Sequence, residues 1–216
     1  MRRWQTGPMR AVIWDLGGTL IDTYPDVDRA LASALDPQPD EQLLHEVAQL
    51  TRISSSHAIS TLAARHQVAE HRLRAAYEAT KLHWQEHPPA AMEGARDLLE
   101  AVHGAGGLNL VATHRERGSA AALLEVLELP IDDMVCAPDG FARKPDPAMV
   151  LALLERHSLA PEDCLAVGDR PADIAAARAA GVPGVLLETA GIELEAGDAE
   201  RVTSLPALGA RLSRRE

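Results

Sequence analysis

The sequence predicts an α/β fold, a Rossmann-like parallel sheet core with a small all-α helical cap inserted after the first strand. From residue 90 onward, short apolar runs alternate with helical segments, the pattern of a parallel sheet covered on both faces. Before it, about 65 residues keep a helical period without any strand. We therefore predict a core over 9–22 and 90–216, a cap over 23–89 and a disordered leader over 1–8.

The first strand is expected to begin near Met9 and to end at a carboxylate. Its apolar residues, Val12 to Trp14, favour a strand, and Asp15 follows directly on a turn that contains Gly17 and Gly18. A strand-end aspartate on a glycine turn is a candidate nucleophile or metal ligand. Taken alone it is as readily explained as an ordinary turn residue.

Three amphipathic helices are expected in the cap. Asp40 can cap the first of them, and Ser54 to Ser56 can start the second. The third runs over 70–86 and is ended by the His-Pro-Pro sequence at 87–89. These helices predict a compact insertion.

The rest of the chain alternates between helix and strand. Helices are expected over 94–103, 118–129, 147–157 and 171–180, and strands over 108–113, 134–137, 164–169 and 184–188. A final helix is expected after Leu205, and Gly181 is a good residue to end the helix before it.

Composition excludes several classes of protein. The chain is 46% hydrophobic and 25% charged, which is typical of a globular protein. A net charge of -11 argues against general nucleic-acid binding, because no basic surplus neutralises phosphates. No apolar run approaches the roughly 20 residues of a membrane span, and residues 1–8 lack the apolar core of a signal peptide. We therefore expect a cytoplasmic protein, with Cys136 and Cys164 as buried free thiols.

Polar residues from distant parts of the chain stand where ligands bind in such a sheet. Asp15, Thr113 and Asp169 lie at the carboxyl ends of predicted strands, and Lys144 lies in a loop after another strand. Open α/β sheets bind ligands beyond these strand ends. The four side chains are therefore expected to converge on one site.

The residue types suggest phosphoryl transfer. Asp15 and Asp169 offer the oxygen ligands that Mg²⁺ prefers, and Asp173 lies one turn into the next helix, where it could orient Lys144. Thr113 and Lys144 suit phosphate oxygens. Each residue alone is explained equally well by a turn, a helix end or a solvated surface. Their order on one alternating pattern favours a site.

Four motifs resemble the haloacid dehalogenase-like superfamily over nearly the whole chain. They are "DLGGT", "LVATH", "RKPDP" and "GDRPAD", at 15–19, 110–114, 143–147 and 168–173. The first departs from the superfamily pattern Asp-x-Asp-Gly-Thr at its third place. A helical cap between the first two motifs looks like the first cap subclass, as in phosphoglycolate phosphatase-like enzymes.

The resemblance implies roles for the acidic residues. Asp15 is expected to be the nucleophile that forms an aspartyl-phosphate. The backbone carbonyl of Gly17 would ligate Mg²⁺ together with Asp15 and Asp169, and Asp173 would support the metal shell. The implied reaction is Mg²⁺-dependent phosphatase chemistry.

The expected substrate is a small phosphorylated metabolite that the cap selects. Thr113 and Lys144 would hold the phosphoryl oxygens, and Gly18 of the first motif would also contribute to substrate binding. Two polar residues at the expected edge of the site, His114 and Arg52, are further candidates for substrate binding. The pattern specifies neither the individual substrate nor the oligomeric state.

Gly17 removes a group that phosphatases of this superfamily use. Their aspartate at this place protonates the leaving oxygen and then deprotonates the attacking water, and glycine does neither. Such acid–base help contributes about 10²–10⁴ in rate. We therefore expect slow turnover of alkyl phosphates and a preference for acyl or aryl phosphates. His114 is one candidate replacement, because its ordinary pKa suits proton transfer. Residues between two cap helices, Arg52, Ser55 and His57, are the other candidates.

Three other functions stay open. A carbon–halogen hydrolase of the superfamily would need no metal, which the acidic fourth motif does not favour. A phosphonate hydrolase would need a lysine of the cap, and the cap contains only Lys81. A non-catalytic protein that binds a phosphorylated ligand or a partner is the third reading.

Overall fold

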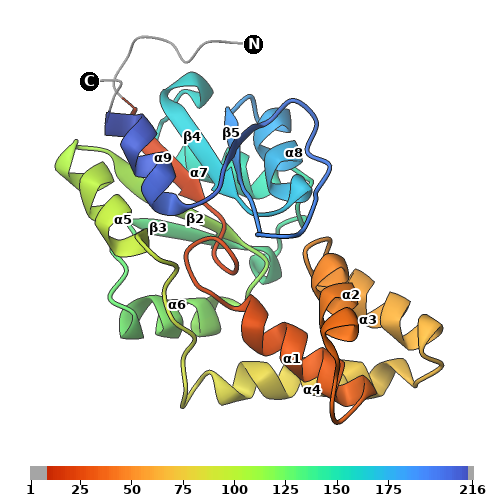
Figure 1. The fold of residues 1–216 in the computed structure, drawn as a ribbon. Coiled ribbons are helices and arrows are strands. Elements are labelled where there is room, and N and C mark those ends of the chain that lie inside the picture. The colour runs from red at the N-terminus through yellow and green to blue at the C-terminus, as the bar shows by residue number, and fades with distance from the viewer. Residues whose placement is uncertain (1–8, 214–216) are drawn as a thin grey trace.

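The computed structural model describes residues 9–213 and contains one sheet of six parallel strands (Figure 1). The strand order is β3-β2-β1-β4-β5-β6. The strands are β1 (Ala11–Trp14), β2 (Leu108–Thr113), β3 (Asp133–Cys136), β4 (Cys164–Gly168), β5 (Gly184–Leu187) and β6 (Glu200–Val202). The predicted α/β class with a parallel sheet is confirmed.

The helices of the described residues fall into two groups. Four lie between β1 and β2, namely α1 (Tyr24–Leu35), α2 (Glu41–Thr51), α3 (Ser55–Arg65) and α4 (Glu70–His83). Five others accompany the sheet, namely α5 (Ala95–Gly104), α6 (Arg117–Val126), α7 (Ala148–Arg156), α8 (Pro171–Ala179) and α9 (Leu205–Leu212). Short 3₁₀ turns occur at Ala137–Asp139 and Pro161–Asp163.

The central strand β1 is fully buried and divides the core into two layers. Val12 and Trp14 belong to the cluster that includes residues of α5 and α9, whereas Ala11 and Ile13 belong to the cluster with α7 and α8. Successive side chains of a strand point to opposite faces, so each layer receives alternate residues. Figure 1 shows helices on both sides of the sheet.

The sheet register places the expected site residues at one edge. Trp14 is level with Val111 of β2 on one side and with Val167 of β4 on the other. The backbone N–H of Asp15 donates to the carbonyl of Val167 over 2.8 Å. The chain therefore leaves β1 and β4 at nearly the same height, with Asp15 and Asp169 as the residues that follow.

Helices α1–α4 pack on one another and lie together beyond the sheet in Figure 1. Two start as the sequence predicts. The side chain of Asp40 accepts from the N–H of Leu43 over 2.8 Å, and the hydroxyl of Ser54 accepts from the N–H of His57 over 3.0 Å. Side-chain caps of this kind satisfy N–H groups that have no partner within the helix.

The two segments that connect α1–α4 to the sheet are hydrogen-bonded to each other. The N–H of Asp22 donates to the carbonyl of Ala90, and the N–H of Met92 donates to the carbonyl of Leu20, each over 2.9 Å. Between them, Ile21 and Ala91 form an antiparallel bridge. We call this pair of segments, 20–22 and 90–92, the hinge pair.

The structure differs from the prediction at several boundaries and adds α1 to the three helices that were expected between β1 and β2. The first strand begins at Ala11, and the sequence pattern missed β6, because its three residues are mostly polar and pairing with β5 defines them. Helix α4 ends at His83, where the chain passes into turns before two prolines. The predicted leader, 1–8, lies outside the described residues. Both cysteines are free and buried, as expected.

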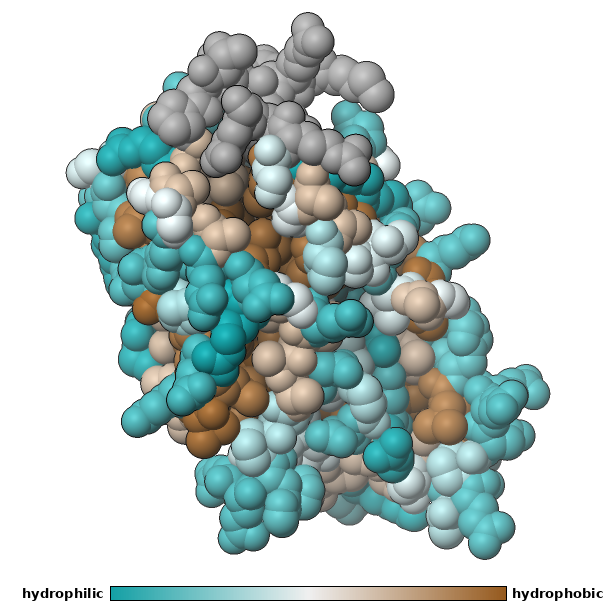
Figure 2. Space-filling model, turned by 60° about the vertical axis from the view of Figure 1, so that its left-hand side comes forward, coloured by the Kyte–Doolittle hydropathy of each residue, from teal (hydrophilic) through white to brown (hydrophobic). Residues whose placement is uncertain are grey.

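Figure 2 shows one face of the molecular surface. The face in Figure 2 is largely covered by hydrophilic residues, with apolar patches between them. Large apolar side chains exposed in the described chain are scattered over four elements or their ends, at Ile53, Leu82, Val126 and Leu151. Of the helices described, none has the length and apolar character needed to cross a bilayer.

Candidate active site

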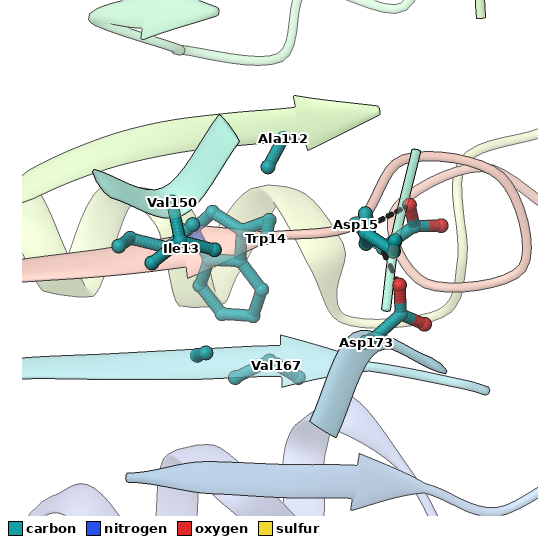
Figure 3. A pocket seen from close by; sticks show the side chains of 9 residues that line it. Ile13, Trp14, Asp15, Ala112, Val150, Val167 and Asp173 are labelled. Carbon is teal, nitrogen blue, oxygen red and sulfur yellow. Dashed lines mark hydrogen bonds and ion pairs between the residues drawn. The ribbon is translucent and has the colours of Figure 1, made fainter. Parts of the chain in front are cut away.

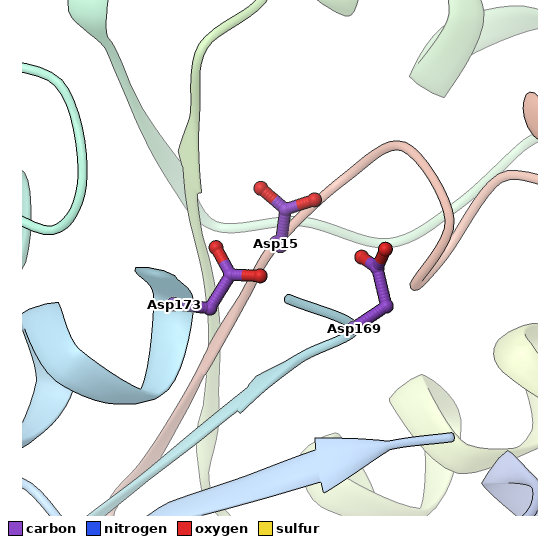
Figure 4. Close-up of side chains that lie close together, drawn as sticks. All are labelled: Asp15, Asp169 and Asp173. Carbon is purple, nitrogen blue, oxygen red and sulfur yellow. The ribbon is translucent and has the colours of Figure 1, made fainter. Parts of the chain in front are cut away.

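Three carboxylates meet beyond the ends of β1 and β4 (Figure 4). Asp15 follows β1, Asp169 follows β4, and Asp173 lies in the first turn of α8. One oxygen from each of them lies within 4.8 Å of the others. Residues separated by more than 150 positions thus form one cluster at the sheet edge that the sequence pattern indicated.

Lys144 neutralises two of these carboxylates. Its Nζ lies 2.6 Å from Oδ1 of Asp15 and 2.6 Å from Oδ1 of Asp173. Only 4% of the lysine side chain is exposed, so little water screens these contacts. Burial alone would lower the pKa of Lys144, but the charges of Asp15 and Asp173 outweigh it and raise the pKa. Lys144 therefore stays a cation beside Asp15.

Asp173 acts mainly on Lys144 and on the start of α8. Its Oδ1 accepts from Lys144, and its Oδ2 accepts from the backbone N–H of Arg170 over 2.9 Å. A Cβ at Gly168 would lie 2.3 Å from the Cβ of Asp173, so only glycine fits under this side chain. Asp173 is thus a residue that positions Lys144.

Asp169 is fully buried and held through both oxygens. The Thr19 hydroxyl donates to Oδ1 over 2.8 Å, and the Tyr24 hydroxyl donates to Oδ2. Burial raises the pKa of Asp169 to about 6, and the charges of Asp15 and Asp173 add to this effect. The charge of Arg170, whose Nε lies 3.9 Å from Oδ2 of Asp169, acts in the opposite direction on this pKa. The contacts with Thr19 and Tyr24 fix the carboxylate beside Asp15.

Gly18 allows the close approach of Tyr24. Its φ of +90° is in the left-handed region, and a Cβ there would lie 2.3 Å from Cε2 of Tyr24. Gly17 has no such backbone requirement, and its nearest neighbour is the Thr23 side chain, with Oγ1 3.0 Å from an added Cβ. Gly18 is therefore needed for the turn, whereas a side chain at Gly17 meets one movable hydroxyl.

An apolar floor lies beneath Asp15 and Asp173 (Figure 3). The small cavity there measures about 10 Å³, close to the space of a single water molecule. Its apolar lining consists of Ile13, Trp14, Ala112, Val150, Ala166 and Val167. This cavity is therefore too small to hold a phosphorylated substrate.

Thr113 ends β2 and His114 follows it, but His114 does not suit acid–base chemistry. Its Nε2 accepts from the backbone N–H of Lys144 over 2.8 Å. Burial, together with the charges of Lys144 and Arg143, lowers the pKa of His114 to about 4. His114, which was expected to replace the missing acid, is thus a neutral ring that holds the loop of Lys144. Thr113 is buried and caps this turn by accepting from the N–H of Arg115 over 3.1 Å.

Arg52 also differs from its expected role. Its side chain is 8% exposed, and its guanidinium forms an ion pair with Asp28 and lies 3.7 Å above the ring of Tyr24. Nη1 also donates to the hydroxyl of Thr51 over 2.8 Å. Arg52 therefore packs within the helical region and fixes Tyr24, instead of presenting its charge to a substrate.

The sequence pattern did not single out Tyr24 and Arg115, two residues that join the sheet to helices α1–α4. Tyr24 reaches Asp169 from the start of α1, and Arg115 lies under the end of α4, where its Cζ is 4.7 Å from the Trp84 ring centroid. Arg115 follows Thr113 by two positions, and Tyr24 follows Asp15 by nine. Their nearness to the first two motifs was the available signal.

The donor set fits Mg²⁺. All three clustered groups are carboxylates, and Mg²⁺ takes oxygen ligands while it keeps several waters. Asp169 is already oriented by Thr19 and Tyr24, which is how neighbouring hydrogen bonds usually hold a metal ligand. Asp15 accepts from Lys144 through Oδ1, which leaves Oδ2 for other contacts.

Residues 12–187 match the family model for haloacid dehalogenase-like hydrolases, which covers most of the chain. The chain belongs to this family. The resemblance seen in its four motifs is confirmed, and so is the expectation of a hydrolase of this family.

Relatives of known name support the same membership. The phosphoglycolate phosphatase of Rhodospirillum rubrum is 35% identical over 192 residues, which cover 82% of this chain and 79% of that protein. The phosphoglycolate phosphatase of Nitrosospira multiformis is 32% identical over 211 residues, with 81% of each chain covered.

Solved structures share the fold. A HAD family hydrolase of Deinococcus radiodurans with bound phosphate and sodium has a TM-score of 0.78 at 25% identity, and 96% of each chain is covered. CbbY of Rhodobacter sphaeroides, in complex with xylulose-(1,5)bisphosphate, has a TM-score of 0.72 at 22% identity. That match covers 93% of this chain and 96% of CbbY, and it shows the fold alone.

Proposed function

We propose that the protein is a Mg²⁺-dependent phosphatase that hydrolyses a small phosphorylated metabolite through an aspartyl-phosphate on Asp15. The observation that carries this proposal is the contact of Asp15 with Lys144 beside two further carboxylates. A carboxylate held next to a cation and a candidate metal site suits attack on a phosphoryl group, because charge neutralisation provides most of the rate. Phosphoglycolate phosphatases among the relatives are consistent with it.

Asp15 attacks phosphorus through Oδ2, because Oδ1 is engaged by Lys144. The new bond joins Oδ2 to phosphorus, and the bond from phosphorus to the ester oxygen breaks. Water then attacks the aspartyl-phosphate and releases inorganic phosphate and the free carboxylate. Lys144 and Thr113 hold phosphoryl oxygens during both steps.

Asp15, Asp169 and the carbonyl of Gly17 would hold the metal. When bound, Mg²⁺ would neutralise charge on the phosphoryl group and offset the repulsion between the carboxylates. Asp173 would keep Lys144 in place. Thr19 and Tyr24 would keep Asp169 pointing at the metal.

Because Gly17 supplies no acid, the rate of hydrolysis depends strongly on the leaving group of the substrate. No carboxylate stands two residues after Asp15 to protonate an alkoxide, and His114 is neutral and engaged with the N–H of Lys144. We therefore propose slow hydrolysis of alkyl phosphates and faster hydrolysis of aryl and acyl phosphates, whose leaving groups need no proton. The aspartyl-phosphate accumulates if water attack is slowed more than the first step.

We further propose that residues 23–89 act as a cap that selects the substrate. This segment contains α1–α4 and joins the core through the hinge pair. Its contacts with the core include Tyr24 with Asp169 of the carboxylate cluster, and Trp84 with Arg115 after β2. A segment so placed can cover a bound substrate and exclude water.

The test follows phosphate release from acetyl phosphate and p-nitrophenyl phosphate, with and without Mg²⁺, together with the intact mass of the protein. We expect turnover that requires Mg²⁺ and is lost in Asp15→Asn. A mass gain of one phosphoryl group would identify a slow second step. Absence of turnover and of labelled protein, with no rescue by Gly17→Asp, would overturn the proposal.

A non-catalytic binding role is the second candidate, and Gly17 is the observation that favours it. Such a protein would bind phosphate analogues with Mg²⁺ and release no phosphate in the same assay. Phosphonate hydrolysis is not favoured, because Lys81 pairs with Glu78 over 2.9 Å and lies 4.3 Å from the Tyr77 ring centroid.

A further inference from the structure

Arg170 is a cation at the carboxylate cluster to which the proposed reaction assigns no role. It directly follows Asp169, and its Nε lies 3.9 Å from Oδ2 of that residue. Only 1% of the Asp169 side chain and 20% of the Arg170 side chain are exposed, so solvent screens this pair weakly. Arg170 is therefore a counter-ion of Asp169 that the chain itself supplies.

Tyr24 holds the guanidinium of Arg170 beside Asp169. Nε of Arg170 donates to the Tyr24 hydroxyl over 2.9 Å, and that hydroxyl donates to Oδ2 of Asp169. A phenol has one proton to donate, and a hydroxyl that accepts from Arg170 keeps this proton for Asp169. Cζ of Arg170 lies 5.7 Å from the centroid of the Tyr24 ring. The charge of Arg170 is thus kept at Asp169 by a hydrogen bond as well as by the ion pair.

The two cations at the cluster serve different carboxylates. Lys144 lies 2.6 Å from both Asp15 and Asp173. Among residues 9–213, Arg170 forms the only ion pair with Asp169. Asp169 is also a proposed ligand of Mg²⁺, so a metal bound there would face the charge of this guanidinium. Like charges repel strongly where the dielectric is low.

We propose that Arg170 competes with Mg²⁺ for Asp169 and so keeps the affinity of the protein for the metal low. The inference rests on the proposed function, because it takes Asp169 as a ligand of the metal. In the metal-free protein, Arg170 offsets the charge of Asp169. In the protein with Mg²⁺ bound, the same charge opposes the metal. Arginine suits this role because it stays charged in proteins.

The first test measures the binding of MgCl₂ alone by calorimetry. Arg170→Gln should bind Mg²⁺ about 10- to 100-fold more tightly than wild type, because one repelling charge is removed. Glutamine has its Nε2 at the place of the arginine Nε, so a donor to Tyr24 is kept. Arg170→Lys keeps the charge and should stay within about threefold of wild type. Arg178→Gln is the matched control, since Arg178 lies on the same helix with 61% of its side chain exposed; it should leave the affinity unchanged.

Tighter binding by Arg170→Lys equal to that by Arg170→Gln would overturn the inference, and so would equal or weaker binding by Arg170→Gln. Absence of Mg²⁺ binding in both wild type and Arg170→Gln would overturn it as well. Should Arg170→Gln fail to fold, Arg170→Asn takes its place, because Arg170 is the N-cap of α8 and asparagine is favoured there.

The second test compares melting temperatures with and without MgCl₂. Arg170→Gln should melt at a lower temperature than wild type in the metal-free state, because Asp169 stays buried without its counter-ion. Mg²⁺ should then raise the melting temperature of Arg170→Gln more than that of wild type. An equal loss with and without Mg²⁺ would mean that Arg170 only stabilises the fold, and would overturn the inference. Neither test needs turnover, so tighter Mg²⁺ binding by Arg170→Gln supports the inference even if the protein releases no phosphate.

Discussion

Replacing Gly17 by aspartate should install the acid–base group that the chain lacks. The backbone at Gly17 is compatible with an L-residue, and the new Cβ would lie 3.0 Å from Oγ1 of Thr23. Thr23 must therefore give way by a few tenths of an ångström, which is a rotation of one side chain. We expect a stability cost of about 1 kcal/mol, at the low end for an added side chain in a packed site.

The gain in rate depends on the leaving group. General acid–base help contributes about 10²–10⁴, so ethyl phosphate hydrolysis should rise within that range. The p-nitrophenolate ion leaves without a proton, so its ester should gain less in the first step. The neighbouring carboxylates Asp15 and Asp169 raise the pKa of an added carboxyl group, which favours the protonated form that the first step needs.

The assay measures kcat/KM for both esters and the phosphorylated fraction of the protein during turnover. Gly17→Asn is the matched control, since it adds nearly the same volume without an ionisable group. Gly17→Ala measures the effect of the Cβ alone. In Gly17→Asp, the phosphorylated fraction should fall, because water attack is accelerated.

Equal rates for Gly17→Asp and Gly17→Asn on ethyl phosphate would refute the reasoning. That result, in folded protein that turns over p-nitrophenyl phosphate, would mean that another group already supplies the proton. A stability loss above about 3 kcal/mol would instead show that Thr23 cannot move, since such costs mark overpacking in a rigid site.

Three further predictions concern the groups around the cluster. Lys144→Met should lower the free energy of unfolding by about 3–5 kcal/mol in urea titrations, because Asp15 and Asp173 lose a buried partner; a loss below about 1 kcal/mol would contradict it. The depressed pKa of His114 means that the folded protein favours the neutral ring. The contribution of His114 to the free energy of unfolding is therefore fully present above pH 6.5 and is lost as the pH falls toward about 4. His114→Gln should therefore reduce the stability difference between pH 7 and pH 5 by about 1–2 kcal/mol, and an unchanged difference would exclude this source. Tyr24→Phe should weaken Mg²⁺ binding about 10- to 100-fold in calorimetry, because Asp169 loses an orienting hydrogen bond, whereas unchanged affinity would show that Thr19 suffices.

Hydrophobic periodicity was enough to predict most of the fold. Buried strands such as Cys164–Gly168 are apolar throughout, and helices such as α2 begin at side chains that mark their own start. The strand β6 could not be predicted in this way, because Glu200 and Arg201 carry no strand signal and adopt the strand only by pairing with β5. Its extended form is set by tertiary contacts.

The meeting of Asp15, Asp169 and Asp173 could be predicted, since the topology of a parallel sheet brings strand ends together. The roles of His114 and Arg52 could not, because their types suit both ligand binding and internal hydrogen bonding. A sequence pattern does not show that Nε2 of His114 faces the N–H of Lys144 or that Asp28 faces Arg52. Such partners become known only when the backbone path is known.

The hinge pair limits how α1–α4 can move. A segment tied by one free linker could drift in many directions, whereas two connections bonded through Ile21 and Ala91 leave few rotational degrees of freedom. Tyr24, which contacts Asp169, and Trp84, which contacts Arg115, belong to the same group of helices, and the bond from Trp84 to Asp26 links the start of α1 to the end of α4. A rotation of α1–α4 about the hinge pair would therefore open both contacts together, so that substrate entry would also release Asp169 from Tyr24.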